Sequence, residues 1–351
     1  MPSSIFKMSK PRNPIKQRLL EATKERGRVQ DIGFILQLVA AAGYTDEARQ
    51  AASTCKTLRQ DDELWLPVLR KPIGVRERHP LFHALTVRDD RRVRWLCNHI
   101  HYPLTLVDSD GHGLLWYCVR YEMPLIAYFC ERGAQVDTVD RLGQTALFYA
   151  IANQRVSSID ALLRCGANLN HRCHASMTPL YVAAQKGNLE IIQLLCNKGA
   201  RVDEASVVRS VRYGHMGVLQ EFLERDGSLE SADKNGHSLL HYAVQFNHFT
   251  LCTYLLEFLD VNCTSRNQVT PLMLAPTLAI WNALLNEGAL VNRGDINGWT
   301  ALHYAVHHRR PTIVKALLEN GADKSRLTHS GMSALDLAIV KEFNELVQLL
   351  Q

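Results

Sequence analysis

Features that mark membrane-spanning proteins and disulfide-stabilised secreted proteins are missing from this sequence. Its longest apolar runs, such as TLAIWNALL at 277–285, are far shorter than the roughly 20 residues that cross a bilayer. The nine cysteines include no CxxC pair, and the N-terminal stretch MPSSIFKMSKPRNPIKQ has charges and prolines where a signal peptide has an apolar core. We therefore expect a protein without a membrane span, in a reducing compartment.

Motifs of the common catalytic families are also missing. The chain contains no GxxxxGK[ST], GxSxG or HExxH pattern. Two histidine–cysteine clusters, at 97–101 and 171–174, have no second ligand pair at zinc-site spacing. The stretch DSDGHG at 108–113 has the wrong length and ligand positions for a calcium loop and is better interpreted as a turn. We predict that the protein is not an enzyme and has no metal, cofactor or small-molecule substrate.

The net charge of +5 is concentrated at the N-terminus. Residues 1–30 hold eight Lys or Arg and two Glu, so the remaining 321 residues sum to −1. A neutral body argues against nucleic-acid binding. We expect the basic segment to be a solvated tail, with nuclear or organelle targeting as the alternative. The predicted location is the cytoplasm, with the nucleus left open by the tail.

What the sequence does contain is an internal repeat. A leucine or valine recurs at spacings between 27 and 34 residues, in contexts such as TPLYVA, SLLHYA and TALHYA. A second signature follows about 15–20 residues after most of these anchors, for example LLRCGANLN or LLENGADKS. The anchors are Leu81, Leu115, Leu147, Leu180, Val207, Leu240, Leu272, Leu302 and Leu335.

Each part of the repeat fits a pair of helices. Thr or Ser precedes the anchor, where an N-cap accepts a backbone N–H, and Pro179 and Pro271 occupy the first helical position. Paired leucines such as Leu317 and Leu318 share the inward face of a second helix, and a glycine such as Gly321 ends it. Because one repeat cannot bury its own apolar face, neighbouring repeats must stack into a continuous core.

A period near 33 residues with a T-P-L-H-x-A motif resembles the ankyrin repeat, across roughly residues 79–351. The resemblance implies an all-α solenoid of helix–turn–helix units with β-hairpin-like connections. About eight or nine repeats fit within residues 76–351, the last of them a C-terminal cap. The implied function is protein–protein interaction, with a protein partner docking on the concave face formed by hairpin tips and first helices.

Three repeats depart from the pattern. About six residues are missing between Leu180 and Val207, which predicts a degenerate first helix at 207–212. The stretch TPLMLAPTLAIWNALL lacks about three residues of the turn between its helices, and LLEFLDVN has lost the terminating glycine. We expect irregular stacking at these repeats.

His241 and His303 occupy the histidine position of the repeat motif, and each is a candidate base or metal ligand. Other copies place Phe, Trp, Tyr, Met or Asp at this position, which indicates a packing and capping role. The resemblance implies a partly buried histidine that ties down the backbone of a neighbouring hairpin. We therefore predict that both histidines are structural.

The resemblance also predicts a set of binding residues at the hairpin tips and first-helix ends. The set includes aromatic and methionine side chains, which are types enriched in interface hot spots. Each of these side chains could instead pack sideways against the next hairpin. The candidates are Tyr121, His174, Met177, Lys186, His237, Phe246, Trp299, His307 and His308.

Residues 31–75 do not match the repeat and predict a short three-helix segment. The patterns IL-x-L, CK-x-x-R and D-x-x-LW resemble an F-box-like motif, although the usual leucine-proline opening is absent. The resemblance implies docking to the linker subunit of a cullin–RING ubiquitin ligase, with the repeats holding the substrate. The alternative is a cap that seals the first repeat, in a scaffold or targeting protein without a ubiquitin role. The candidate docking residues are Ile35, Leu36, Leu64 and Trp65.

Overall fold

The computed structural model describes residues 80–100 and 104–351. The basic segment 1–30, the segment 31–75 and the four candidate ligase-docking residues lie outside this range, so the predictions made for them stay predictions. The chain divides into two compact units. The first holds the described residues up to Asn168 together with Cys173–Ala175, and the second holds Leu169–Arg172 and Ser176–Gln351.

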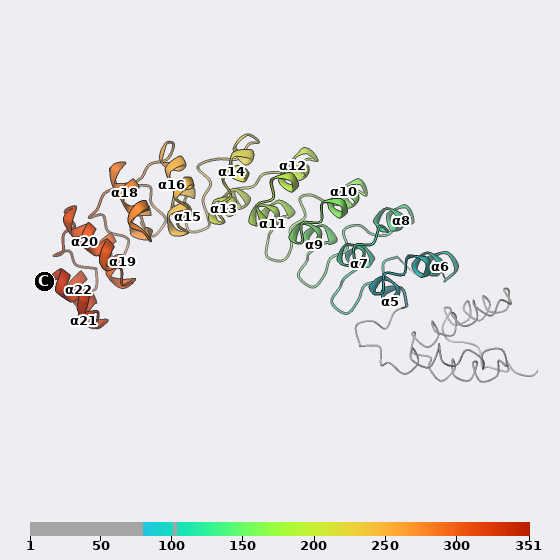
Figure 1. Ribbon diagram of the computed structural model, residues 1–351, viewed down its shortest axis with the longest axis horizontal. Helices are drawn as coiled ribbons and strands as arrows, with labels where there is room; N and C mark the ends of the chain where they lie inside the picture. Colours follow the sequence, from blue (N-terminus) through green and yellow to red (C-terminus); the bar gives the residue numbers. More distant parts are fainter. Residues whose placement is uncertain (1–79, 101–103) are drawn as a thin grey trace, which may run out of the picture. The chain divides into compact units, whose positions relative to one another are not determined.

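The described residues of the first unit form three pairs of helices, drawn in blue to green in Figure 1. The pairs are α5 (Pro80–Thr86) with α6 (Asp90–Ile100), α7 (Leu114–Arg120) with α8 (Ile126–Glu131), and α9 (Ala146–Ala152) with α10 (Val156–Arg164). The first helices α5, α7 and α9 pack side by side, with α7 in the middle, and α8 packs against α10. Stacking therefore produces a layer of first helices and a layer of second helices.

The second unit continues the same pattern with six pairs (Figure 1). Each first helix packs on the next one along the chain. In a separate layer, the second helix α12 packs on α14, and α16, α18, α20 and α22 pack in succession. The pairs are α11 (Pro179–Lys186) with α12 (Leu189–Asn197), α13 (Glu204–Arg212) with α14 (Met216–Leu223), α15 (Leu239–Gln245) with α16 (Phe249–Leu256), α17 (Pro271–Leu274) with α18 (Leu278–Asn286), α19 (Ala301–His307) with α20 (Pro311–Glu319), and α21 (Ala334–Val340) with α22 (Asn344–Leu350).

The connections between pairs are hairpin-like loops rather than strands. Within residues 80–100 and 104–351 there is no β-strand, and two isolated antiparallel bridges join Val107 to Gly113 and Ala232 to Ser238. None of the helices in these ranges is long and apolar enough to span a membrane. The predicted all-α architecture of stacked helix pairs is confirmed.

The repeat anchors lie in the core between the two layers. All of them are buried except Leu335, which is half-buried. The largest fully buried side chains include Phe129 and Phe148 in the first unit and Trp281 and Phe222 in the second. Complete burial of an aromatic or aliphatic side chain contributes roughly 1.5–3 kcal/mol. The leucine spacing in the sequence therefore marks the core correctly.

The helix ends also follow the predicted signals. Thr178 Oγ1 accepts a hydrogen bond from the Tyr181 N–H at 3.2 Å, and Pro179 occupies the first position of α11. Thr300 and Ser333 lie at the N-caps of α19 and α21, as predicted. Thr178 and Ser333 thereby satisfy N–H groups that have no partner inside the helix. Thr145 also lies at an N-cap, that of α9, but its hydroxyl accepts no hydrogen bond, contrary to the prediction.

One of the irregular repeats is more regular than the sequence suggested. The first helix at this repeat, α13, has nine residues and begins earlier than predicted, because Asp203 caps it by accepting the Ser206 N–H at 3.0 Å. It packs between α11 and α15. The prediction of a degenerate helix at 207–212 is therefore wrong. The missing hairpin residues shorten the loop before the helix and leave the helix itself intact.

The repeat around Pro276 is irregular, as predicted. Its first helix α17 has only four residues and ends at Leu274, and Pro276 lies in the loop before α18. Proline disfavours helical backbone in the residue that precedes it, which limits the length of α17. The core is preserved here because α18 contributes the buried side chains Ile280, Trp281 and Leu284.

A side chain at the turn between two paired helices reaches back to the preceding pair. It bonds a carbonyl oxygen near the C-terminal end of the preceding first helix, where intrahelical donors are lacking. These bonds tie neighbouring pairs together within each unit. They join Arg155 Nη1 to Arg120 O (2.9 Å), His215 Nε2 to Gln185 O (3.1 Å), His248 Nε2 to Arg212 O (2.9 Å) and Arg310 Nη1 to Ala275 O (2.8 Å).

The ring of one of these histidines, His215, explains why the residue at position 187 is a glycine. Gly187 has a φ of +73°, and a Cβ at this position would lie 2.3 Å from the ring of His215. The equivalent residue Glu122 also has a positive φ, of 55°, but it carries a side chain that forms an ion pair with Arg155 (Oε1 to Nη2, 3.1 Å). Glycine is therefore required where an imidazole ring, rather than an extended arginine, crosses the turn.

Candidate protein-binding surface

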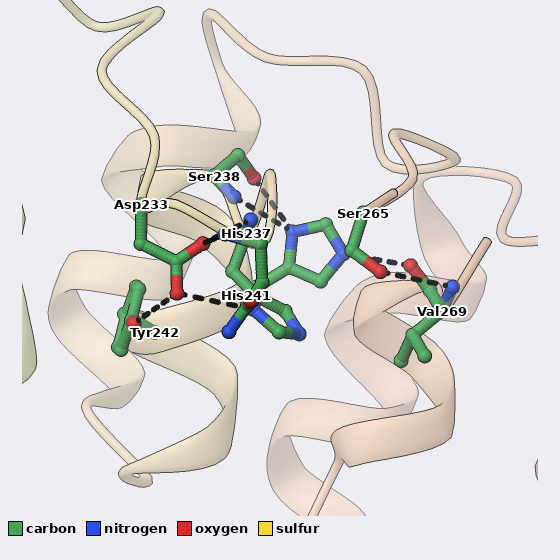
Figure 2. A network of polar contacts seen from close by, with 8 residues as sticks. Asp233, His237, Ser238, His241, Tyr242, Ser265 and Val269 are labelled. Atoms are coloured by element: carbon green, nitrogen blue, oxygen red, sulfur yellow. Dashed lines mark hydrogen bonds and ion pairs between the residues drawn. The ribbon is translucent and has the colours of Figure 1, made fainter. Parts of the chain in front are cut away.

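His241 ties the start of its own helix to the next connecting loop (Figure 2). Its Nδ1 accepts a hydrogen bond from the Ser238 N–H at 3.1 Å. Because Nδ1 is an acceptor, Nε2 carries the proton and donates it to the carbonyl oxygen of Val269 at 2.9 Å. Both ring nitrogens are therefore occupied by the fold.

His303 repeats this arrangement, with Nδ1 accepting the Thr300 N–H at 3.2 Å and Nε2 lying 3.3 Å from the carbonyl oxygen of Met332. Both histidines are about 1% exposed. Burial lowers the pKa of His241 to about 4 and also lowers the pKa of His303 below its usual value. Neither ring is available as a base or metal ligand, which confirms the predicted structural role.

An aspartate holds the connection before several first helices in one conformation. Its Oδ1 accepts the N–H groups two and four residues later, and its Oδ2 accepts the hydroxyl of a tyrosine in the following helix. Loops held in this way need little ordering when a partner binds. The pairs are Asp108 with Tyr117 (2.9 Å), Asp233 with Tyr242 (2.8 Å) and Asp295 with Tyr304 (2.9 Å).

The protonation states in these pairs are set by the hydrogen bonds, as the Asp233 pair in Figure 2 illustrates. Burial alone would raise the pKa of Asp233, but hydrogen bonds from His237, Tyr242 and Asn235 outweigh burial and leave the pKa below its usual value. Burial and the Asp233 carboxylate raise the pKa of Tyr242 to about 12. At neutral pH the carboxylate is therefore ionised and the phenol protonated, so the donor and acceptor roles are unambiguous.

Among the described residues, Asp108, Asp110 and His112 form one group with donor atoms within 4.8 Å of one another. The Asp108 carboxylate already accepts the Tyr117 hydroxyl and lies 3.0 Å from His112 Nδ1. A cation would have to displace these bonds, which hold the loop. The arrangement therefore fits the interpretation of DSDGHG as a loop.

A cluster of rings and one arginine covers α7 and α9 in the first unit, and we call it the Arg120 cluster (His112, Trp116, Arg120, Tyr121 and Tyr149). The imidazole of His112 stacks on Trp116 with ring centroids 3.8 Å apart, and Trp116 lies 5.0 Å from Tyr149. Arg120 lies over Trp116 at 5.3 Å and donates from Nη1 to the Tyr149 hydroxyl at 2.9 Å. The cluster joins two neighbouring repeats.

A second set of rings and arginines crosses α11, α13 and α15 in the second unit. We call it the Arg209 ladder (Tyr181, Gln185, Arg209, Arg212, Tyr213, Tyr242 and Phe246). The guanidinium of Arg209 lies 4.7 Å from the ring centroid of Tyr181 and 4.8 Å from that of Tyr213. Arg212 lies 4.9 Å from the ring of Phe246, which stacks on Tyr242 at 6.2 Å. Each contact of an arginine with a ring contributes roughly 0.5–2 kcal/mol.

A third set lies at α19, and we call it the Trp299 cluster (Trp299, Tyr304, His307 and His308). Trp299 is half-buried, with its ring centroid 5.6 Å from that of Tyr304 and 5.4 Å from that of His307. His307 and His308 are exposed, and burial followed by nearby positive charge, Lys341 for His307 and Arg310 for His308, lowers the pKa of each ring. They are therefore neutral at pH 7 and present polar, uncharged rings.

The nine predicted binding residues lie on first helices, at the residues that end them or on the connections before them; Tyr121, Phe246 and His308 are the C-caps of α7, α15 and α19. They do not form one site: Trp299, His307 and His308 lie together, Phe246 joins the Arg209 ladder, and Tyr121 joins the Arg120 cluster. The exposed members are His174, Lys186, Phe246, His307 and His308, and the half-buried members are Tyr121, Met177, His237 and Trp299.

Two of the nine pack in part against their own repeat, which is not the packing against the next hairpin that the alternative describes. His237 Nδ1 lies 3.3 Å from Asp233 Oδ2, so this ring helps to hold its loop. Trp299 packs on Tyr304 of the following helix. Both still present part of the ring to solvent.

The sequence-based prediction missed Arg209, Arg212 and Tyr213, because it treated their helix as degenerate. Their signal is the helical spacing after the cap at Asp203. This spacing places all three side chains on the face opposite the buried Val207.

The family model for ankyrin repeats in three copies matches residues 115–206, 207–293 and 277–351. These matches cover more than half of the chain and coincide with the stacked helix pairs. The chain therefore belongs to the ankyrin-repeat family. Ankyrin repeats are modules for protein–protein interaction, which is the class of protein that the fold defines.

Several curated proteins share the repeats. Inversin from Mus musculus is 30% identical over 202 residues, which cover 52% of this chain and 19% of inversin. Transient receptor potential cation channel subfamily A member 1 from Homo sapiens is 26% identical over 233 residues, covering 61% and 21%. Palmitoyltransferase AKR1 from Lachancea kluyveri is 27% identical over 175 residues, covering 45% and 24%. The chain thus spans less than a quarter of the length of these relatives, and the likeness concerns their shared repeats.

Proposed function

We propose that this chain binds a protein partner through its first-helix face, meaning the solvent-facing side chains of the first helices, of the residues that end them and of the connections before them. The observation that carries the proposal is the gathering of rings and arginines on this face in both units. Aromatic and arginine side chains are the types that dominate binding energy at protein interfaces. Here they are already held by stacking and by the aspartate–tyrosine pairs, so binding would order few side chains.

The proposal predicts that Phe246→Ala combined with Trp299→Ala weakens partner binding. Each truncated anchor is expected to cost about 2 kcal/mol, because hot-spot side chains contribute at this level. Recovery of the principal partner should therefore fall by about tenfold or more. The measurement is affinity capture from eukaryotic lysate with the tagged full chain, quantified by mass spectrometry against the unsubstituted chain.

A matched control removes two exposed rings from a second helix and its end. Phe249 and Phe258 are 48% and 56% exposed, so Phe249→Ala with Phe258→Ala deletes comparable aromatic surface outside the first-helix face. This control should retain the partner. Equal retention by both variants, with both folded by circular dichroism, would contradict the proposed location of the binding surface.

As a finer hypothesis we propose that the chain recruits substrates to a cullin–RING ubiquitin ligase. The F-box-like pattern in residues 31–75 supports it, with Ile35, Leu36, Leu64 and Trp65 as the docking residues. The competing hypothesis is a scaffold or targeting protein in which this segment only caps the repeats. The two differ in whether these apolar side chains face a partner or the first repeat.

Substitution of Leu36→Glu together with Trp65→Ala in the full chain separates these two hypotheses. An adaptor should lose cullin-complex subunits from the captured material while it keeps the partner that depends on Phe246. A cap should instead show a lower unfolding temperature and unchanged partners, because its apolar contacts stabilise the first repeat. If the unsubstituted full chain recovers no cullin subunit, the adaptor hypothesis is wrong.

A further inference from the structure

The Arg209 ladder differs from the other clusters in its charge. Lys186, Arg209 and Arg212 lie near the C-terminal ends of α11 and α13, and Glu204 is the one carboxylate on these two helices. None of the ion pairs formed among the described residues involves Arg209 or Arg212. The ladder therefore presents positive charge that no carboxylate of the described chain neutralises.

Contacts with rings and amides hold these arginines in place. Arg209 Nη2 donates to Gln185 Oε1 at 2.8 Å, while the rings of Tyr181 and Tyr213 both lie within 5 Å of the guanidinium. Its Nε is buried and has no hydrogen-bond partner among the described residues. Burying an unpaired donor costs free energy, so this placement is not the one that stability alone would favour.

The rings beside the arginines remain accessible. Tyr213 is 41% exposed and Phe246 is 38% exposed, and each lies within 5 Å of a guanidinium. The ladder therefore offers apolar ring surface directly next to fixed positive charge. A ligand that matches it must carry negative charge and apolar side chains at neighbouring positions.

We propose that the Arg209 ladder binds an acidic, partly apolar segment of a partner protein. Carboxylates of the segment bond to Arg209 and Arg212, and an apolar side chain lies against Tyr213 and Phe246. The inference rests on the proposed function, because it names the chemistry of the partner for one part of the first-helix face.

The charge of the chain favours a peptide over a nucleic acid as the occupant. The formal charges of residues 31–351 sum to −1. The ladder offers two cations, Arg209 and Arg212, and Lys186 at the end of α11 adds a third. Nucleic acids bind through many phosphate contacts, each needing a lysine or arginine. A short acidic segment of a protein needs only the few cations that the ladder provides.

The test selects short random peptides on the immobilised full chain and measures the affinity of the enriched peptides by fluorescence polarisation. Enriched peptides should carry excess Asp and Glu next to apolar residues. Arg209→Gln combined with Arg212→Gln should raise the Kd of these peptides by about tenfold or more, since fixed guanidinium groups form strong bonds with carboxylates. Raising the salt concentration should also weaken binding.

Two further variants make the result specific. Lys198→Gln with Lys315→Gln removes the same charge from the second-helix layer and should change the Kd by less than about twofold, as expected for exposed residues outside the site. Arg209→Lys with Arg212→Lys keeps the charge but loses the flat guanidinium. It should bind with an affinity between those of the glutamine variant and the unsubstituted chain.

The proposal is overturned if no peptide is enriched or if the enriched peptides lack excess acid. It is equally overturned if the glutamine variant, shown to be folded, binds as the unsubstituted chain does, or if a uridine-rich single-stranded RNA binds more tightly than any peptide. If capture still depends on Phe246 and Trp299 in those cases, the proposed function stands and only the acidic chemistry fails. If that dependence also disappears, both fail.

Discussion

Replacing Trp281 with alanine is expected to lower the free energy of unfolding of the second unit by about 3–5 kcal/mol, the range for truncating a buried aromatic side chain. Trp281 is 1% exposed and lies on α18, the partner of α17, which is the shortest first helix in the described chain. Few other side chains can close the cavity, because α17 contributes only one turn. Urea unfolding followed by circular dichroism measures the change.

The loss should appear first in the affected repeat, because each repeat is stabilised mainly by contacts with its neighbours. Hydrogen exchange in the alanine variant should therefore increase over α17 and α18 before it increases over α13. Unchanged exchange in α17 and α18, or a loss below about 1 kcal/mol, would mean that Trp281 does not support this repeat in the way its burial suggests.

The matched control is Trp281→Phe. The indole Nε1 is buried and has no hydrogen-bond partner among the described residues. Phenylalanine loses part of the ring but also removes this unpaired donor, whose burial costs about 1–3 kcal/mol. The net change should stay within about 1.5 kcal/mol, as for conservative apolar exchanges. If phenylalanine costs as much as alanine, the indole N–H contributes a bond of its own.

The second large effect is a pH dependence caused by His241. Its pKa is about 4 in the folded chain, and a histidine in an unfolded chain titrates near 6.5. Between these values the unfolded chain binds a proton that the folded chain does not. The free energy of unfolding should therefore be constant above pH 6.5 and fall by about 3 kcal/mol as the pH drops towards 4.

His241→Phe separates this effect from general acid sensitivity. The variant should lose about 1–2 kcal/mol at pH 7, because the Ser238 N–H and the Val269 carbonyl lose their partner. Phenylalanine is a natural occupant of this position, as Phe82 and Phe148 show. Urea unfolding measured from pH 7.5 to 4.5 should then give a smaller slope than in the unsubstituted chain.

The double variant with His303→Phe should flatten the slope further, because burial lowers the pKa of His303 in the same direction. If the slope between pH 6.5 and 4.5 is the same in the unsubstituted chain and in both variants, the acid sensitivity comes from other groups. The aspartate–tyrosine pairs also titrate in acid. Because the pKa of Asp233 is lowered, however, its contribution to stability is lost only below this pH window.

Local signals in the sequence were sufficient to predict the helix pairs. Threonine at an N-cap, proline at the next position and glycine after paired leucines each act within one helix turn, so they can be recognised without a structure. The prediction of a degenerate helix at α13 failed because the local signals differ there. Its cap is Asp203 rather than threonine, and the shortened loop before the helix places this cap outside the usual repeat spacing.

The candidate surface could be predicted only in part. Sequence position predicted that Phe246 and Trp299 lie beside first helices and reach solvent, as the structure shows, because the repeats share one register. The contact of Arg209 with Tyr181 could not be predicted, since Tyr181 belongs to a different repeat. Contacts of this kind depend on how closely neighbouring pairs stack and on which rotamers the rings adopt.

The sequence by itself determined the repeat, the helix pairs, the buried leucines and the structural role of His241 and His303, because these depend on spacing and on bonds between adjacent loops. Only the tertiary structure decided which exposed side chains form clusters. It also showed that Arg209 and Arg212 form no ion pair with a carboxylate of the described chain. The physical reason is distance along the chain. Groups about 30 residues apart, such as Arg209 and Tyr181, interact only after stacking brings their helices side by side.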